Sequence, residues 1–257
     1  MMNCFRKAVL SIAGLFFLFV AFAAPQEYLS TTLDVQSGLS DNCVNDVLFD
    51  SENFLWIGTN EGLDFYEGTN VMHFDLPHPE SGRPSVVFSL CEDNSGTIWA
   101  GCSNGLYCVR KNQAGVSRFD NSWLNGVPVR QMCCDRNGIL WIPRNGNDLL
   151  QVNTVTGLVT TLPVDCKSIC VTCTGTVYVL TKEDCLMVSS DGQKDLEPVS
   201  SEIDRILFNK GVSRMVCAAG RLFLSSGEGA PFVLDLATHQ ISKVNFLSKM
   251  AFFVLIP

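Results

Sequence analysis

Short apolar runs separated by polar turn residues recur along the chain with a period of about 40 residues. In the clearest copies an aspartate begins a turn and a tryptophan follows six residues later. The tryptophans of these copies, Trp56, Trp99 and Trp141, are spaced by 43 and 42 residues, and each has an apolar residue on either side. Because neighbouring side chains of a strand point to opposite faces, three apolar residues in a row predict a strand that is covered on both sides.

Five copies of this pattern align on the aromatic residue. The aromatic position holds Trp56, Trp99, Trp141, Tyr178 and Phe223. The residues before it are Leu55, Ile98, Leu140, Val177 and Leu222, and those after it are Ile57, Ala100, Ile142, Val179 and Leu224. Both flanking columns are apolar in every copy, which indicates a true internal repeat.

A second turn follows each aromatic strand. Six residues past the aromatic stand Gly62, Gly105, Asn147, Asp184 and Gly229, the residue types that most easily adopt the positive φ of a hairpin turn. Three residues further on, the next strand presents Phe65, Cys108, Leu150, Met187 and Phe232. With a strand ahead of the aspartate turn, such as 44–49, and an outer strand, such as 71–74, each copy makes a four-stranded antiparallel meander.

Sheets that are covered on both faces and repeat at this period are the blades of a β-propeller. The predicted fold class is therefore all-β, with blades near residues 44–74, 87–118, 129–161, 166–198 and 212–246. Five blades close into a ring if residues 28–35 supply the outer strand of the last blade. The alternative is an incomplete seven-bladed propeller, whose exposed apolar faces would favour homo-oligomers or a missing partner.

Structural roles account for the repeated residues. An aspartate at the start of a turn accepts backbone N–H bonds from two residues on, and glycine relieves the strain of a positive φ. The aromatic residues are expected to pack between blades rather than to offer a sugar-binding platform, and paired catalytic carboxylates would not recur once per blade. This structural role is assigned to Asp50, Trp56, Gly62, Asp93, Gly96, Trp99, Gly105, Asp135, Gly138, Trp141, Gly175, Tyr178, Gly220 and Phe223. No catalytic residue is assigned, and the pattern does not single out ligand-binding residues.

The N-terminal residues have the pattern of an export signal. Arg6 and Lys7 precede an apolar run, and small residues end it, so cleavage is predicted after Ala23. The apolar run is shorter than the roughly 20 residues that span a bilayer, which disfavours the alternative of an uncleaved membrane anchor. The predicted organisation is a signal peptide at 1–23, a propeller domain at 24–246 and a short apolar tail at 247–257.

Composition narrows the possible functions. The 257 residues are 47% hydrophobic and 17% charged, with a net charge of -8, so the chain is neither disordered nor basic enough to grip nucleic acid. The three histidines, His73, His78 and His239, are scattered in sequence, and their expected role is that of surface imidazoles. Neither a nucleophile elbow nor a phosphate-binding glycine loop is visible, so no cofactor is expected and an enzyme is disfavoured.

Twelve cysteines raise the alternatives of disulfides or a metal site. Removal of Cys4 with the signal peptide leaves an odd number, so complete pairing within one chain is impossible. Two residues before the aspartate turn, the column reads Leu48, Cys91, Cys133, Cys170 and Met215, which predicts that these cysteines pack as small hydrophobic residues. Cys166, Cys170, Cys173 and Cys185 have only approximate zinc-ligand spacing, and no metal site is assigned.

The first copy carries a family resemblance. Gly38-Leu39-Ser40-Asp41-Asn42-Cys43-Val44, followed by Asp50, Trp56-Ile57-Gly58-Thr59 and Gly62-Leu63, resembles the two-component regulator propeller repeats of bacterial hybrid two-component sensors. The second and third copies keep much of the motif and the last two are eroded. The resemblance implies an exported sensor propeller that passes a periplasmic signal, often a glycan breakdown product, to a cytoplasmic histidine kinase.

Three functions follow from these observations. The first is a periplasmic ligand-binding sensor module, or an N-terminal fragment of one, that takes a small molecule or oligosaccharide and acts with the remaining propeller or the kinase portion of a split sensor. Phosphotransfer is not assigned to this chain. The second is a propeller enzyme similar to streptogramin lyases, which would need convergent histidine and acidic side chains at one mouth of the propeller. The third is a non-signalling interaction scaffold.

Overall fold

The computed structural model describes residues 32–76, 82–110, 115–144, 148–189, 195–226 and 231–243. The chain divides into two units, Met1–Leu33 and Asp34–Pro257, and the propeller belongs to the second. The predicted signal peptide, the predicted apolar tail and His78 lie outside the described residues.

Five four-stranded antiparallel sheets make up an all-β propeller of five blades, which confirms the predicted fold class. In each sheet the strands pair in chain order. The first blade holds β1 (Val44–Phe49), β2 (Leu55–Thr59), β3 (Gly62–Tyr66) and β4 (Val71–Phe74), and the second holds β5 (Val87–Glu92), β6 (Thr97–Cys102), β7 (Gly105–Arg110) and β8 (Val116–Arg118). The third holds β9 (Cys133–Cys134), β10 (Ile139–Arg144), β11 (Asp148–Asn153) and β12 (Val159–Leu162).

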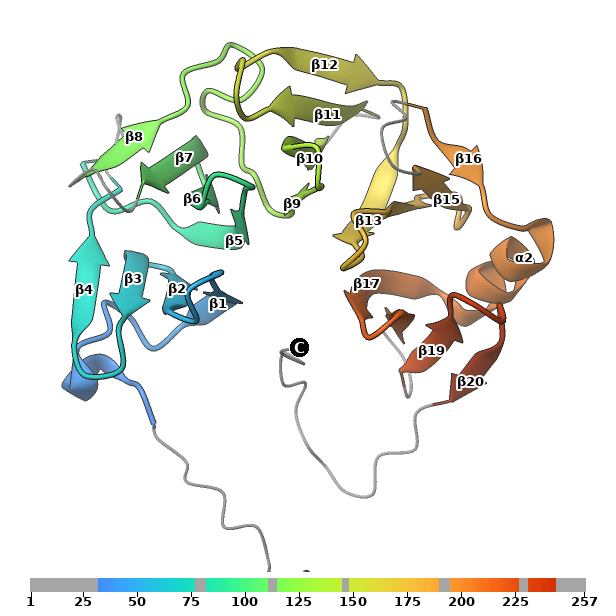
Figure 1. The fold of residues 1–257 in the computed structure, drawn as a ribbon, viewed down its shortest axis with the longest axis horizontal. Coiled ribbons are helices and arrows are strands. Elements are labelled where there is room, and N and C mark those ends of the chain that lie inside the picture. Colours follow the sequence, from blue (N-terminus) through green and yellow to red (C-terminus); the bar gives the residue numbers. More distant parts are fainter. Residues whose placement is uncertain are drawn as a thin grey trace, which may run out of the picture. The chain divides into compact units, whose positions relative to one another are not determined.

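The last two blades repeat the meander. The fourth holds β13 (Cys166–Val171), β14 (Val177–Thr181), β15 (Leu186–Ser189) and β16 (Glu197–Pro198), and the fifth holds β17 (Val212–Ala218), β18 (Arg221–Ser226), β19 (Phe232–Asp235) and β20 (Ile241–Lys243). Figure 1 shows the blades following one another around a common centre, with β1, β5, β9, β13 and β17 innermost. The first strand of every blade therefore lines the centre.

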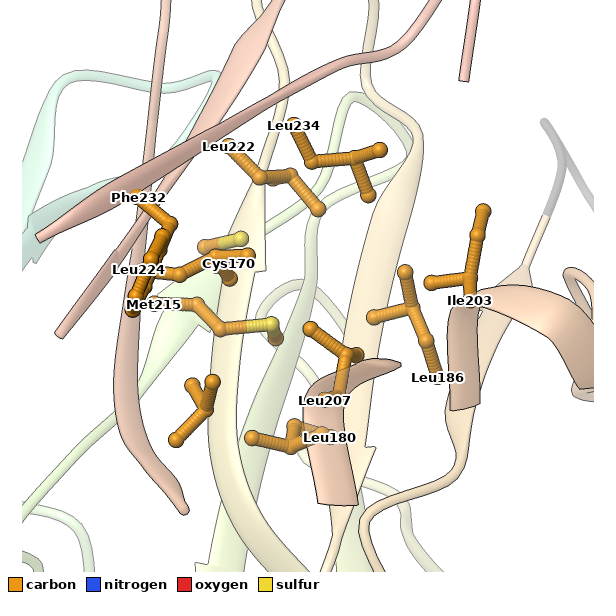
Figure 2. Close-up of a cluster of buried hydrophobic side chains, with 11 residues drawn as sticks. Cys170, Leu180, Leu186, Ile203, Leu207, Met215, Leu222, Leu224, Phe232 and Leu234 are labelled. Carbon is orange, nitrogen blue, oxygen red and sulfur yellow. The ribbon is translucent and has the colours of Figure 1, made fainter. Parts of the chain in front are cut away.

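The hydrophobic core consists of layers between successive blades. Trp56 packs on residues of the second blade, Trp99 on the third and Trp141 on the fourth. The layer between the fourth and fifth blades joins Cys170 and Leu180 to Met215 and Leu224 (Figure 2). These four layers join the blades in order from the first to the fifth, so the second, third and fourth sheets are buried on both faces, as the flanking columns require.

Two short helices are additions to the predicted strands. A 3-10 helix, η1 (Val35–Ser37), precedes the first blade, and α2 (Ser201–Lys210) connects the fourth blade to the fifth. Ser200 caps the start of α2, and Gly211 ends it with a φ of 57°. Ile203 and Leu207, one helical turn apart, bury α2 against the last core layer, as Figure 2 shows.

The proposed closing strand at 28–35 is not what completes the last blade. Its outer strand is β20, which comes from the blade's own copy of the repeat. Residues 32–34 are irregular and Val35 begins η1, while residues 28–31 lie outside the described part.

Turn lengths shift two of the predicted columns by one residue, the first in three blades and the second in the fifth blade. The second turn of the third, fourth and fifth blades is one residue longer than assumed, so Gln151, Val188 and Val233, rather than Leu150, Met187 and Phe232, lie opposite the aromatic residue. In the fifth blade the first turn is short, with Ala219 and Gly220 both at positive φ between the paired residues Ala218 and Arg221. Val216, not Met215, therefore lies opposite Phe223.

Candidate functional site

The aspartates of the repeat are saturated with hydrogen bonds at the turn between the first two strands of a blade. In the second blade, Oδ1 of Asp93 accepts bonds from the N–H groups of Ser95 at 2.9 Å and Thr97 at 3.0 Å, and Oδ2 accepts one from Nε1 of Trp99 at 2.9 Å. The same set recurs around Asp50 with Trp56 and around Asp135 with Trp141. These turns tie the tryptophans in place and leave little capacity to bind anything else.

The eroded copies replace this arrangement. In the fourth blade, Oγ1 of Thr172 accepts the bond from the N–H of Thr176 at 3.0 Å, and Tyr178 takes the aromatic position. Gly96, Gly138 and Gly175 have φ values of 76°, 72° and 92°, so glycine suits each of these turns. Gly62 and Gly105 have positive φ in the second turn. The predicted repeat residues thus lie apart from one another, once per blade, and are not gathered into one site.

At the end opposite the aspartate turns, the innermost strands carry β-bulges instead of a repeated motif. Four of the five strands have an irregular register near their first residues, between Val44 and Asp46, Val87 and Ser89, Cys166 and Ser168, and Val212 and Arg214. A bulge re-aims the side chain of the extra residue. The residues inside these four bulges are Asn45, Phe88, Lys167 and Ser213.

A central cavity of about 1070 Å³ lies between the innermost strands, and the bulge residues line it. Its wall carries the basic side chains of Arg130, Arg144, Lys167, Lys182 and Arg214, together with the acidic side chains of Asp46 and Glu92. No histidine lines it within the described part of the chain. Because this cavity is open, polar and lined by a different residue type in each blade, it is the candidate ligand site.

Two arginines of the cavity wall stack on aromatic rings, and one of these rings, Phe88, also lines the cavity. The guanidinium of Arg130 lies 4.6 Å from the centre of the Phe88 ring, and that of Arg144 lies 5.3 Å from the centre of the Trp123 ring. Trp123 is 44% exposed, unlike the three buried tryptophans of the repeat. Such stacks hold a guanidinium plane in place while its N–H edge stays available.

Three of the five cations have a carboxylate partner. Nζ of Lys167 lies 2.8 Å from Oδ1 of Asp184, Nζ of Lys182 lies 2.6 Å from Oδ1 of Asp165, and Nη2 of Arg144 lies 3.0 Å from Oδ2 of Asp148. Within the described part of the chain, Arg130 and Arg214 have no carboxylate within salt-bridge distance. These two arginines are therefore the wall cations that no carboxylate neutralises by a direct ion pair, while Asp46 and Glu92 are the acidic residues of the same wall.

Polar residues at or next to the bulge positions link the blades. Asp46 accepts a bond from the N–H of Leu90 at 2.7 Å, and Oγ of Ser168 accepts one from the N–H of Met215 at 3.0 Å. Between the third and fourth blades, Nε2 of Gln131 donates to the carbonyl of Ile169 at 3.0 Å. Burial raises the pKa of Asp46 to about 6, although the backbone bonds and the charge of Arg214 oppose the shift.

A separate polar network lies on the first blade and does not have the geometry of a nucleophilic triad. Asp64, fully buried, accepts bonds from the N–H and hydroxyl of Ser40 at 2.9 and 2.8 Å and lies 2.9 Å from Nδ1 of His73. Ser40 contacts the carboxylate rather than the imidazole, so His73 is not placed to activate it. His73 is exposed, as a surface imidazole should be, and its ring nitrogens also pair with Asp64 and Asp75.

The eleven cysteines of the described part are free thiols. Cys91, Cys133 and Cys170 are buried in successive layers between blades, so they pack as the repeat predicts. Cys133 and Cys134 join different layers, which places them on opposite faces of β9. Burial raises the pKa of Cys134 and of Cys166 to about 12, so both thiols are protonated and unreactive at neutral pH.

Within the described ranges, His, Cys, Asp and Glu side chains form no group of three or more suited to holding a metal ion. In the same part of the chain, no helix is both long and apolar enough to cross a membrane.

The first two copies of the repeat match a known family model. The family model of the two component regulator propeller matches residues 38–61 and 81–104, which confirms the resemblance of the first two copies. No curated protein matches the chain.

Solved structures of low sequence identity share the fold. The extracellular domains of two hybrid two component systems from B. thetaiotaomicron superpose with TM-scores of 0.65 and 0.60 at 18% identity, over 82% and 80% of this chain. The chain spans only 31% and 29% of their lengths. Virginiamycin B lyase from Staphylococcus aureus superposes with a TM-score of 0.61 at 13% identity, over 82% of this chain and 73% of the lyase.

Proposed function

We propose that this chain is the ligand-binding propeller module of a two-component sensor, and that an oligosaccharide binds at the central cavity. The observation that carries the proposal is the contrast between the two ends of the blades. The aspartate turns repeat and are saturated, whereas the four bulges hold four different residues and line a cavity whose wall includes Arg130 stacked on Phe88. Aromatic rings and hydrogen-bonding edges held on a rigid scaffold suit a sugar ligand.

The family of the first two repeats supports a role in signal input. Their sequences match the two component regulator propeller, and the shared fold includes extracellular domains of hybrid two component systems. We infer that the chain is exported to the periplasm and that phosphotransfer is carried out by a histidine kinase portion elsewhere. A ligand can bias that kinase only through two conformations that it binds unequally, so the binding module and the kinase must be physically connected.

The similarity in fold to virginiamycin B lyase raises the alternative of an enzymatic role. The central cavity disfavours it, because the wall of the cavity in the described part of the chain contains no histidine beside its acidic residues. His73 lies on an outer strand and His239 in the turn before β20. We therefore expect virginiamycin B to be recovered unchanged after incubation with the purified chain, as measured by mass spectrometry.

Titration of the purified chain with oligosaccharides tests the binding function. The probes are neutral tetrasaccharides from cellulose, mannan and amylose and acidic ones from polygalacturonate, hyaluronan and chondroitin sulfate. Trp123 is exposed and stacks on Arg144, which lines the cavity, so a ligand that contacts Arg144 should change the intrinsic fluorescence of the wild type. Calorimetry on the Trp123→Phe variant should still record binding while the fluorescence change is lost. Absence of a saturable signal for all six probes would rule the proposal out.

Export has its own test. The chain expressed in a Gram-negative host should be recovered from the periplasmic fraction with Ala24 as its first residue. Recovery in the cytoplasm with residues 1–23 intact would contradict the periplasmic assignment.

A further inference from the structure

We propose that the central cavity binds an acidic oligosaccharide, and that the guanidinium of Arg130 holds one carboxylate or sulfate group of it. The inference rests on the proposed ligand-binding function and adds the chemical class of the ligand. It is carried by the position of one arginine, by the backbone around it and by the charges of the cavity wall.

Arg130 has free hydrogen-bonding capacity at an accessible place. Its side chain is exposed, it lines the central cavity, and one face of its guanidinium stacks on Phe88 at 4.6 Å. No hydrogen bond or ion pair of its guanidinium occurs within the described part of the chain. A planar guanidinium with a free edge matches the two oxygens of a carboxylate or sulfate.

The residues on either side of Arg130 fix its backbone. The N–H of Val129 donates to the carbonyl of Cys102 at 2.9 Å, and the Val129 side chain is 1% exposed. The side chain of Gln131 is tied to the fourth blade through the carbonyl of Ile169. The arginine therefore projects from a segment that both neighbouring blades hold, which lowers the entropy lost when a ligand binds.

The segment that carries Arg130 departs from the repeat, and a buried hydroxyl of the second blade is left without a partner. The innermost strand of the third blade is only two residues long, so the residues before Cys133 leave the ladder. Asp46 and Ser168 bond to the N–H of the following blade, but the hydroxyl of Ser89, in the same position of the second blade, has no partner in the described part of the chain. A broken structural rule beside a cavity is typical of a functional site.

The charges of the wall favour a single acidic group rather than a polyanion. Lys167, Lys182 and Arg144 are each neutralised by an aspartate. Arg130 and Arg214 are the two wall cations with no carboxylate within salt-bridge distance in the described part of the chain, and Asp46 and Glu92 are the acidic residues of the same wall. Of the two arginines, Arg130 stacks on a ring that also lines the cavity. A ligand with a carboxylate or sulfate on one sugar and neutral hydroxyl groups elsewhere fits this distribution.

The test compares Arg130→Gln with Arg205→Gln. Arg205 lies exposed on α2 and does not line the cavity, so its substitution controls for the loss of one positive charge. The six tetrasaccharide probes are titrated by calorimetry into wild type and both variants at low and high salt. Equal melting temperatures and circular dichroism spectra show that both variants fold.

We expect at least one acidic probe to bind the wild type, at least tenfold more weakly to Arg130→Gln, and unchanged to Arg205→Gln. Salt should weaken the wild-type affinity for this probe, because the contact is exposed to screening. Binding of neutral probes that Arg130→Gln leaves unchanged, with no binding of acidic ones, would overturn the inference but preserve the binding function. Equal losses in both variants would also overturn it. Binding of no probe would overturn both.

Discussion

The indole of Trp99 takes part in two kinds of interaction, and substitutions can separate them. Its rings are 4% exposed and pack in the layer between the second and third blades, edge-on to Phe119 with 5.8 Å between ring centres. Its Nε1 donates to Oδ2 of Asp93 at 2.9 Å. Burial raises the pKa of Asp93, but bonds from Ser95, Trp99 and the backbone outweigh it and hold the pKa below its ordinary value.

Removal of the whole side chain should be close to intolerable. Truncation of a buried tryptophan to alanine costs about 3 to 5 kcal/mol, and the carboxylate oxygen left unpaired costs about 1 to 3 kcal/mol more. Because domains are typically stable by only about 5 to 15 kcal/mol, Trp99→Ala is expected to fold poorly or not at all. Trp99→Phe keeps most of the apolar ring and loses the donor, and we expect it to lower the free energy of unfolding by about 2 to 3 kcal/mol.

Urea unfolding followed by circular dichroism measures this difference. Trp123→Phe is the matched control, since Trp123 is 44% exposed and its substitution should change the free energy of unfolding by less than about 0.5 kcal/mol. In the double variant Trp99→Phe/Asp93→Asn, the two losses should not add, because both remove the same bond. Wild-type stability of Trp99→Phe, or full additivity in the double variant, would refute the argument.

Two further predictions concern buried groups. Because the pKa of Asp46 is raised in the folded state, ionisation of this group opposes folding. Its contribution to stability is present below about pH 4 and is lost as the pH rises to about 6. In urea titrations at pH 4 and pH 7, Asp46→Asn should remove roughly 1 to 3 kcal/mol of this pH dependence. A thiol reagent at pH 8 should modify the exposed Cys43 and Cys173 quickly and Cys91, Cys133 and Cys170 only on unfolding; rapid labelling of the buried three in folded protein would contradict the packing.

The repeat made the strands predictable because several independent columns agree. The predicted strands at 44–49 and 71–74 coincide with β1 and β4, and the tryptophans lie between blades. The one-residue errors in the later blades have a common cause. A hydrophobic pattern locates a strand but does not fix the length of the turn before it, and one extra residue moves every following side chain to the other face.

The sequence contains local signals for the helix α2, but they lie outside the repeat pattern. A cap stands at each end of the helix, Ser200 at the start and Gly211 at the end. Between them, Ile203 and Leu207 form an apolar stripe. The candidate ligand site left no such signal. Arg130 and Phe88 are 42 residues apart in sequence. They occupy positions where the five copies share no residue type, so an alignment of the copies does not single them out.

If the proposed ligand binds at the central cavity, the two ends of the blades separate stability from recognition. Near the aspartate turns, each carboxylate bonds to its own turn and to the tryptophan that packs on the next blade, so a change there disturbs both a blade and an interface. At the bulges, a side chain leaves the ladder and faces the central cavity, while the polar residue beside it keeps the blades linked. On the proposed function, substitution at a bulge is therefore expected to alter ligand choice at little cost in stability. The repeat is conserved in this chain where it holds the blades together and varied where it meets solvent, which is the distribution that a binding propeller requires.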